Sequence, residues 1–349
     1  MERAVYRIID ANFNRAREAI RVMEEFCRFA LNCAPLTDRA RQLRHELSAA
    51  IDKLDAARLL SCRDTLADVG VGTTVEGRFK RTSLHDCFTA ASKRLPEALR
   101  AIAETVQTIN PSLAQSIENL RYTAYTLEKD IVLFTGPAEK FRNVRLYVII
   151  SSNLPLDVFS LALRCVAGGA DCIQLRAKDI EDDKLLAIAL EFVQICRSAD
   201  VLSIINDRAD IAVLAGADGV HLGRNDLSAD HARKLLSAPL IIGKSTHSVE
   251  QLHSACAELP TYISLGPVFS TGTKPTARPV GLEYVTRGTE KLADTGIAHV
   301  AIGGITPDNI QKVIEAGAKA IAVCSAVTEA PDPMAACRTL KEKIAASNP

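Results

Sequence analysis

The sequence lacks an excess of either charge: its 349 residues carry 42 Lys and Arg against 42 Asp and Glu, for a net charge of zero. A chain without a bulk positive field is not held to nucleic acid or anionic membranes by electrostatics alone, which argues against both as partners. It also lacks a run of about 18 apolar residues, the length that a membrane-spanning helix requires. We therefore predict a soluble, cytoplasmic protein with small-molecule substrates.

The sequence also lacks any C-x-x-C pair, although it contains ten cysteines. These are scattered singly, mostly beside Leu, Ile, Val or Ala, as small buried apolar residues are. Their distribution predicts free thiols in a reducing compartment and argues against a zinc site. The Walker A pattern G-x-x-x-x-G-K-[ST] is absent too, so neither half of the chain contains that phosphate loop.

The length exceeds that of one typical domain, and the two halves of the chain follow different patterns. From residue 13 to 131, apolar residues recur every three or four positions, as on one face of a helix. This spacing predicts a bundle of about four helices, interrupted by one irregular segment at residues 61–78. We predict a linker at residues 136–143, which separates a helical domain (1–135) from a second domain (144–349).

In the second domain, short apolar runs alternate with helical segments eight times. The runs are RLYVII from residue 145, DCIQLR from 171, VLSIIN from 201, DGVHLG from 218, LIIGKS from 240, YISLGPVF from 262, HVAIGG from 299 and AIAVCSA from 320. Eight strand-helix units predict an α/β fold, a (β/α)8 TIM barrel preceded by the all-α domain. A doubly wound open sheet is the alternative. In a barrel, the active site lies at the carboxyl ends of the strands.

Two cations follow the second predicted strand. Gln174, Arg176 and Lys178 stand at alternate positions, so they share one face of the chain. In a barrel that face is the interior mouth, where two unpaired cations are costly unless an anion binds to them. The alternative is a strand that continues into a solvated loop.

Carboxylates follow the next two strands: Asn206 and Asp207 end one, and Asp226 follows the other. Magnesium binds one or two carboxylates and accepts phosphate oxygens at its remaining positions. Two carboxylates facing the cations of the previous strand therefore predict a site that assembles Mg²⁺ with a polyphosphate. A helix cap is the alternative for each residue taken alone.

Hydroxyl groups, glycines and one ammonium follow the later strands. They are Ser245, then Thr271, Thr273 and Lys274 around Gly272, then Gly303 and Gly304, and finally Cys324 and Ser325. Hydroxyl and backbone N–H groups bind phosphate, and barrels often build a phosphate site after their last two strands. An ordinary flexible loop around Gly272 is the alternative. Two anion sites, one with a metal, predict an enzyme that joins or acts on two phosphorylated molecules.

Six motifs of the second domain occur in the order and spacing of a known family. They are QLRAKD, INDRADIAVLAGADGVHLGRND, IGKSTHS, GPVFSTGTKP, AIGGITPDN and CSAV, within residues 144–345. By these motifs the domain resembles thiamine-phosphate synthase, also called thiamine-phosphate pyrophosphorylase. The resemblance implies a transferase of thiamine biosynthesis that condenses hydroxymethylpyrimidine diphosphate with hydroxyethyl-methylthiazole phosphate, giving thiamine phosphate and pyrophosphate. The alternative is a thiazole-isomerising relative, which lacks the diphosphate site.

The resemblance also implies a role for each candidate residue. The pyrimidine diphosphate would contact Gln174, Arg176, Lys178, Asn206, Ser245 and Lys274; Mg²⁺ would bind Asp207 and Asp226; the thiazole phosphate would contact Thr271, Thr273, Gly304, Cys324 and Ser325. We expect Arg176, Lys178 and Lys274 to be catalytic, because they would stabilise the departing pyrophosphate while the thiazole nitrogen captures a carbocation. We expect His221 to be a hydrogen-bonded structural residue and His247 to lie near the pyrimidine.

The helical domain contains RIIDANFNRAREAIRVMEEFCRFAL, LRHEL, CRDTLADVG, KRLPEALR and LRYTAYTLEKDI, within residues 5–132. It resembles a domain often fused to this synthase, which implies an ATP-dependent kinase that converts hydroxymethylpyrimidine monophosphate to the diphosphate. Its 16 Arg and 4 Lys suit phosphate binding, although Arg–Glu pairing along helices is the simpler account. The candidate residues are Arg63, Asp64, Asp68, Gly70 and Gly72. The alternative is a non-catalytic docking or dimerisation module, and a dimerisation module would make the protein a homo-oligomer.

Overall fold

The computed structural model describes residues 2–66, 68–69, 81–151, 157–178, 180–235, 239–272 and 278–347. The chain divides into two compact units, Met1–Val132 and Leu133–Pro349. Within the described residues, no helix combines the length and the apolar character needed to cross a membrane. The ten cysteines all lie in the described ranges, and they form no disulfide.

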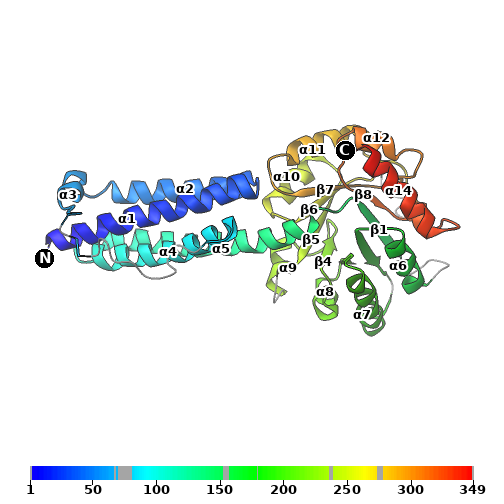
Figure 1. Cartoon of the computed structure of the whole chain (residues 1–349), viewed down its shortest axis with the longest axis horizontal. Helices are drawn as coiled ribbons and strands as arrows, with labels where there is room; N and C mark the ends of the chain where they lie inside the picture. The colour runs from blue at the N-terminus through cyan, green and yellow to red at the C-terminus, as the bar shows by residue number, and fades with distance from the viewer. Residues whose placement is uncertain are drawn as a thin grey trace. The chain divides into compact units, whose positions relative to one another are not determined.

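The first unit is helical (Figure 1). It consists of α1 (Glu2–Glu25), the π-helical turn η1 (Phe26–Ala30), α2 (Ala34–Ile51), the short α3 (Ala56–Ser61), α4 (Leu84–Val106) and most of α5 (Pro111–Phe141). The apolar face of α1 packs against α2 and α4, and Ile9, Ile20 and Met23 on that face are completely buried. The long helices α1, α2, α4 and α5 confirm the predicted bundle.

The second unit is a closed barrel in which each strand pairs in parallel with its neighbours in the sequence, and β8 pairs with β1. This closure confirms the TIM barrel and rules out the open sheet. The strands are β1 (Leu146–Ser151), β2 (Cys172–Arg176), β3 (Leu202–Asn206), β4 (Gly219–Leu222), β5 (Ile241–Thr246), β6 (Tyr262–Leu265), β7 (Ala298–Ile302) and β8 (Ile321–Val323).

Helices follow the strands and surround them (Figure 1). They are α6 (Val158–Ala167), α7 (Asp182–Ser198), α8 (Ala209–Ala215), α9 (Ala229–Leu235), α10 (Val249–Ala257), α11 (Gly281–Leu292), α12 (Ile310–Glu315), α13 (Ser325–Thr328) and α14 (Pro333–Ser347). Because side chains alternate along a strand, each strand contributes to two cores. In β1, Leu146, Val148 and Ile150 pack outward with the helices, whereas Tyr147 and Ile149 join the core inside the barrel.

The predicted linker at residues 136–143 is mostly helical, because α5 continues to Phe141. The reason lies in tertiary packing. Phe141 is 1% exposed and belongs to the core inside the barrel, where its ring stacks on Tyr262 at 4.3 Å between centroids. Burying an aromatic ring in this way stabilises the end of the helix, although its sequence resembles that of a linker.

Candidate active site

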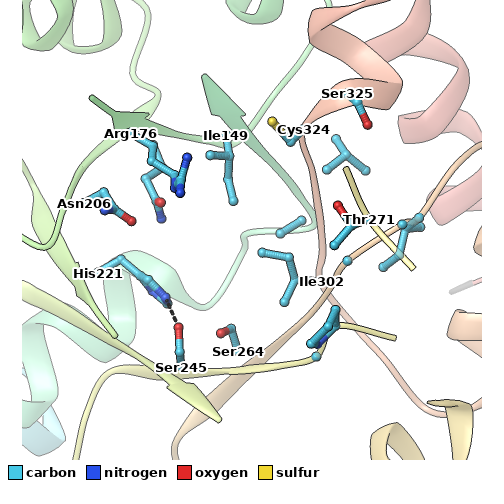
Figure 2. A pocket seen from close by; sticks show the side chains of 18 of the residues that line it. Ile149, Arg176, Asn206, His221, Ser245, Ser264, Thr271, Ile302, Cys324 and Ser325 are labelled. Atoms are coloured by element: carbon cyan, nitrogen blue, oxygen red, sulfur yellow. Dashed lines mark hydrogen bonds between the residues drawn. The ribbon is translucent and has the colours of Figure 1, made fainter. Parts of the chain in front are cut away.

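A cavity lies at the carboxyl ends of the barrel strands, where a barrel is expected to place its active site. Among the predicted site residues, those that line it are Gln174, Arg176, Asn206, Asp207, Ser245, Thr271, Gly304, Cys324 and Ser325. Figure 2 shows Arg176 and Asn206 on one side of the cavity, and Thr271 and Ser325 on the other. The structure therefore brings most of the predicted residues together in two groups.

The sequence interpretation missed the apolar residues between these groups. Ile149 of β1 and Ile302 of β7 also line the cavity, and both lie between the two polar groups in Figure 2. Strand alternation could have found them, because each stands on the same face as the inward residue two positions earlier. Apolar side chains in the middle of a polar cavity suit the flat face of a heterocyclic ring.

Two predicted residues stand beside the cavity without lining it. The Lys178 ammonium lies 3.4 Å from the Asp207 carboxylate, and the Asp226 carboxylate accepts a hydrogen bond from the Gly223 N–H at 2.6 Å. Asp226 is close enough to Asp207 to raise the pKa of the Asp207 carboxyl. Thr273 and Lys274 lie outside the described residues.

Arg176 is the last residue of β2, at the carboxyl end of the strand. Cys172 and Gln174 precede it on the same inward face, as the alternation of the sequence predicts. Among the described residues, no carboxylate lies within salt-bridge distance of Arg176, and its side chain points into the cavity (Figure 2). A cation without a protein partner in a concave site favours an anionic ligand.

Asp207 has an unusual backbone conformation for a residue with a side chain. Its φ of 64° is in the left-handed region, which Asp tolerates better than most residues. Its N–H donates to the carbonyl oxygen of His221 at 2.8 Å, which ties the end of β3 to β4. Strained conformations of this kind cluster at functional sites. Neither Asn206 nor Asp207 caps α8: the residue before that helix is Arg208, which bonds Asp182 and Asp210 instead.

The pair of carboxylates fits a magnesium ion. Burial raises the pKa of Asp207, the neighbouring Asp226 raises it further, and Lys178 opposes both effects. Two carboxylates this close repel each other unless a proton or a cation lies between them. Their oxygens are hard ligands of the type that Mg²⁺ prefers, and a pair leaves the other positions to phosphate and water.

Two glycines form part of the cavity wall next to Thr271 and Ser325. Gly303 and Gly304 have φ values of 103° and 64°. A Cβ on Gly303 would lie 2.4 Å from the Cβ of Pro267, and one on Gly304 would lie 2.4 Å from the Ser270 carbonyl oxygen. No side chain fits at either position, so the backbone itself borders the cavity beside Thr271 and Ser325.

Both candidate histidines line the cavity. His221 is 8% exposed, and its two ring nitrogens bond the Tyr262 hydroxyl at 2.9 Å and the Ser245 hydroxyl at 2.8 Å. This confirms a hydrogen-bonded structural histidine, which in addition contacts a predicted substrate-binding residue. The Nδ1 of His247 bonds the carbonyl oxygen of Gly266.

In the helical unit, two of the candidates are bound to α1. Arg63 donates two hydrogen bonds to the Asp10 carboxylate, both at 2.7 Å, and Arg7 donates to the carbonyl oxygen of Asp64 at 3.2 Å. Asp10 was missed, although an acidic residue on the apolar face of a helix is an unusual pattern. Asp68 is in a described range, whereas Gly70 and Gly72 are not.

Other arginines of this unit also pair with carboxylates on neighbouring helices. Arg44 lies 3.0 Å from the buried Glu24, and Arg39 lies 2.7 Å from Asp130. These pairs join α2 to α1 and to α5. They indicate that some of the arginines of this unit hold helices together and do not bind phosphate.

Comparisons with known proteins match both units. The family described as Thiamine monophosphate synthase matches residues 146–327, and the ThiD2 family matches residues 7–130. A thiamine-phosphate synthase of a Synechocystis strain is 37% identical over 99% of this chain and 98% of its own length. One of Rhodopirellula baltica is 37% identical over 93% of this chain and 88% of its own. A solved structure, the thiamine phosphate pyrophosphorylase from Pyrococcus furiosus, is 33% identical with a TM-score of 0.55 and covers 61% of this chain and 99% of that one.

Proposed function

The chain belongs to the thiamine-phosphate synthase family, and on that premise we propose that its barrel condenses hydroxymethylpyrimidine diphosphate with hydroxyethyl-methylthiazole phosphate. The products are thiamine phosphate and pyrophosphate. The observation that carries this proposal is the carboxylate pair Asp207–Asp226 beside Lys178 and Arg176, which has no carboxylate partner in the part of the chain that the structure describes. A diphosphate needs such a combination of cations and a metal site, whereas a single phosphate does not.

The reaction breaks the bond between the pyrimidine methylene carbon and the diphosphate oxygen. We assign Arg176 and Lys178 to the negative charge that develops on the departing pyrophosphate. Lys274 has the same proposed role. Mg²⁺ bound to Asp207 and Asp226 would act there as a Lewis acid that shares the charge of the phosphate oxygens.

The electron-rich aminopyrimidine ring stabilises the cation that remains, and the thiazole nitrogen captures it. The path is therefore dissociative, and no protein nucleophile takes part. Ile149 and Ile302 would hold the rings by apolar contact and exclude water from the cation. Thr271, Thr273, Gly304, Cys324 and Ser325 would bind the thiazole phosphate, which fixes the nitrogen opposite the reacting carbon.

The test uses the purified full chain with both substrates and Mg²⁺, and it measures pyrophosphate release together with thiamine phosphate by chromatography. We expect equal amounts of the two products, and no turnover when either substrate is withheld or EDTA is present. A chain that rearranges a thiazole phosphate isomer but forms no thiamine phosphate would instead belong with the thiazole-isomerising relatives. The carboxylate pair beside Arg176 argues against that alternative.

We also propose that the helical unit is a kinase that uses ATP to phosphorylate hydroxymethylpyrimidine monophosphate. The ThiD2 match over residues 7–130 supports this activity, which would supply the substrate of the barrel. Arg63 is the residue we assign to the phosphates, since it joins α1 to the irregular segment through Asp10 and remains 48% exposed.

This proposal is tested on the full chain with ATP, Mg²⁺ and the pyrimidine monophosphate, but without thiazole phosphate, so that any diphosphate accumulates. Arg63→Lys should lower its formation, whereas the exposed Arg164→Lys in the barrel should not. Diphosphate formation that is equal in both variants would refute the role of Arg63. No diphosphate from a folded chain would favour a docking or dimerisation module.

A further inference from the structure

A chain of hydrogen bonds crosses the inside of the barrel and ends at two residues of the cavity. The Gln174 Nε2 donates to the Tyr147 hydroxyl at 2.7 Å, and that hydroxyl bonds the Tyr262 hydroxyl at 2.8 Å. Tyr262 bonds the Nδ1 of His221 at 2.9 Å, and the Nε2 of His221 bonds Ser245 at 2.8 Å. We call these five residues the buried chain. They come from five strands, β2, β1, β6, β4 and β5.

Three residues lie inside the buried chain: Tyr147, Tyr262 and His221. Each tyrosine, and His221 in its neutral form, has one proton to donate, so the direction of one hydrogen bond determines the direction of the next. Gln174 Nε2 can only donate, so the Tyr147 oxygen accepts and its proton goes to Tyr262. Tyr262 then donates to the Nδ1 of His221. A neutral His221 therefore carries its proton on Nε2 and donates it to Ser245, whose own proton is left for a ligand.

The surroundings keep the two tyrosines neutral and hold the rings in place. Burial raises the pKa of Tyr147 and of Tyr262 well above their ordinary values. Tyr262 is stacked between Phe141, 4.3 Å away, and His221, 5.5 Å away. A Cβ on Gly243 would lie 2.2 Å from the Tyr262 ring and 2.6 Å from the His221 Nδ1, so the glycine leaves room for both rings.

The two ends of the buried chain consequently have opposite polarity. The bond from its nitrogen to Tyr147 fixes the orientation of the Gln174 amide, so that its carbonyl oxygen is available to the cavity, and Ser245 offers its O–H. The cavity is then complementary to a ring that has a hydrogen-bond donor facing Gln174 and an acceptor facing Ser245. An aminopyrimidine has this pattern, since its amino group stands next to a ring nitrogen.

We propose that Tyr147, Tyr262 and His221 are positioning residues that hold Gln174 as an acceptor and Ser245 as a donor, so that the cavity selects an aminopyrimidine over its oxo analogue. In that analogue, a carbonyl and a ring N–H replace the amino group and the ring nitrogen, which reverses the pattern. The inference rests on the proposed synthase function for its substrate, but the proton positions in the buried chain do not depend on it.

The kinetic test compares kcat/KM for the aminopyrimidine diphosphate and for its oxo analogue. Tyr262→Phe removes the central hydroxyl and keeps the stacked ring, so the polarity is no longer transmitted. The preference for the amino substrate should fall by about tenfold or more, the effect of one misdirected hydrogen bond. Tyr284→Phe is the matched control, because the buried Tyr284 hydroxyl donates to Thr246 at 2.7 Å outside the buried chain. Its preference should equal that of the wild type.

A purely structural role would lower both rates equally and leave the preference unchanged, which would overturn the proposal. Tyr147→Phe breaks the buried chain at another point and replaces Tyr262→Phe if the latter does not fold. The ¹⁵N shifts of His221 in the wild-type chain, assigned with His221→Gln, provide a test that needs no activity. We expect the proton of neutral His221 on Nε2. A proton on Nδ1 would refute the proposed proton positions in the buried chain. If the wild type makes no thiamine phosphate, the synthase function fails, while these shifts still decide the proposal.

Discussion

Arginines in the two units of the protein can have different surroundings, as Arg176 of the barrel and the paired arginines of the helical unit show. In the barrel, Arg176 lies in a cavity with no carboxylate partner among the described residues. In the helical unit, Arg44 lies 3.0 Å from the buried Glu24 carboxylate, and Arg39 lies 2.7 Å from the Asp130 carboxylate. The comparison shows that arginine content alone does not locate a phosphate site. An unpaired guanidinium in a cavity needs a ligand, whereas a paired one between helices stabilises the fold.

The largest effect is expected for Asp207→Ala, which removes one of the two proposed magnesium ligands. Turnover should fall about a thousandfold, because the charge on the departing pyrophosphate is no longer shared with a metal. Stability should not fall, since the change also relieves repulsion from Asp226. Steady-state kinetics over a range of Mg²⁺ concentrations measure the effect, and the exposed Asp183→Ala is the control. Near-normal turnover would refute the metal role.

Arg176→Ala tests the unpaired side of the comparison directly. We expect kcat/KM for the pyrimidine diphosphate to fall by about a hundredfold, the cost of one charge-assisted contact in the transition state. The melting temperature should stay the same or rise, because no carboxylate among the described residues loses a partner. Parallel kinetics and thermal unfolding decide the matter, with Arg164→Ala as the control. A large loss of stability would contradict the assignment of this guanidinium to a ligand.

Arg44→Ala tests the other half of the comparison, an arginine that is paired with a carboxylate. It leaves the 5% exposed Glu24 carboxylate without its partner at 3.0 Å, although Arg41 remains at 3.4 Å. The free energy of unfolding of the helical unit should fall by about 2 kcal/mol, while synthase activity stays unchanged. Hydrogen exchange of α1 and α2 peptides measures the loss. Arg100→Ala removes an exposed pair with Glu104 on the same helix and a longer one with Glu118 of α5 at 3.7 Å, and should cost about 1 kcal/mol or less.

Ser325→Ala tests whether the two sides of the cavity bind different substrates. The KM for the thiazole phosphate should rise about tenfold, as expected for one lost hydrogen bond to a charged phosphate. The KM for the pyrimidine diphosphate should not change, because Arg176 and Asn206 lie on the other side (Figure 2). Ser198→Ala on α7 is the control. An equal change in both KM values would mean that the cavity is not divided in this way.

The smallest effect concerns acid stability of the barrel. Burial and the charge of Lys319 lower the pKa of His299 from 6.5 to about 4, and its Nε2 accepts the Lys319 N–H at 3.1 Å. Between these pH values the unfolded chain binds the proton first, so stability is present above pH 6.5 and is lost as the pH falls toward 4. Partial exposure limits the loss to about 1 kcal/mol between pH 7 and pH 5.

This loss is measured by hydrogen exchange of barrel peptides at the two pH values. His299→Gln keeps an acceptor for the Lys319 N–H and should reduce the pH dependence. His231→Gln, on the surface of α9, should retain it. An unchanged pH dependence in both variants would remove His299 as the cause.

The sequence predicted the local features well because they depend on near neighbours. The period of the apolar residues determined the helices and strands, and alternation along β2 determined that Gln174 and Arg176 share a face. Prediction from the sequence failed where a residue far away in the chain determines the local structure. Residues 136–143 resemble a linker, but Phe141 extends the helix by packing on Tyr262. Capping by Asn206 or Asp207 was the alternative interpretation, and the structure does not show it, because the helix begins after Arg208.

The sequence by itself determined the two halves, the eight strand-helix units and the polar residues at the strand ends, because each is a short-range pattern. Only the tertiary structure decided which of those residues face one another. Closing the barrel brings together the ends of strands that are far apart in the chain, so Asp207 meets Asp226 and Lys178. The same closure joins Gln174 to Ser245 through buried rings, since inward side chains from all strands share one narrow interior.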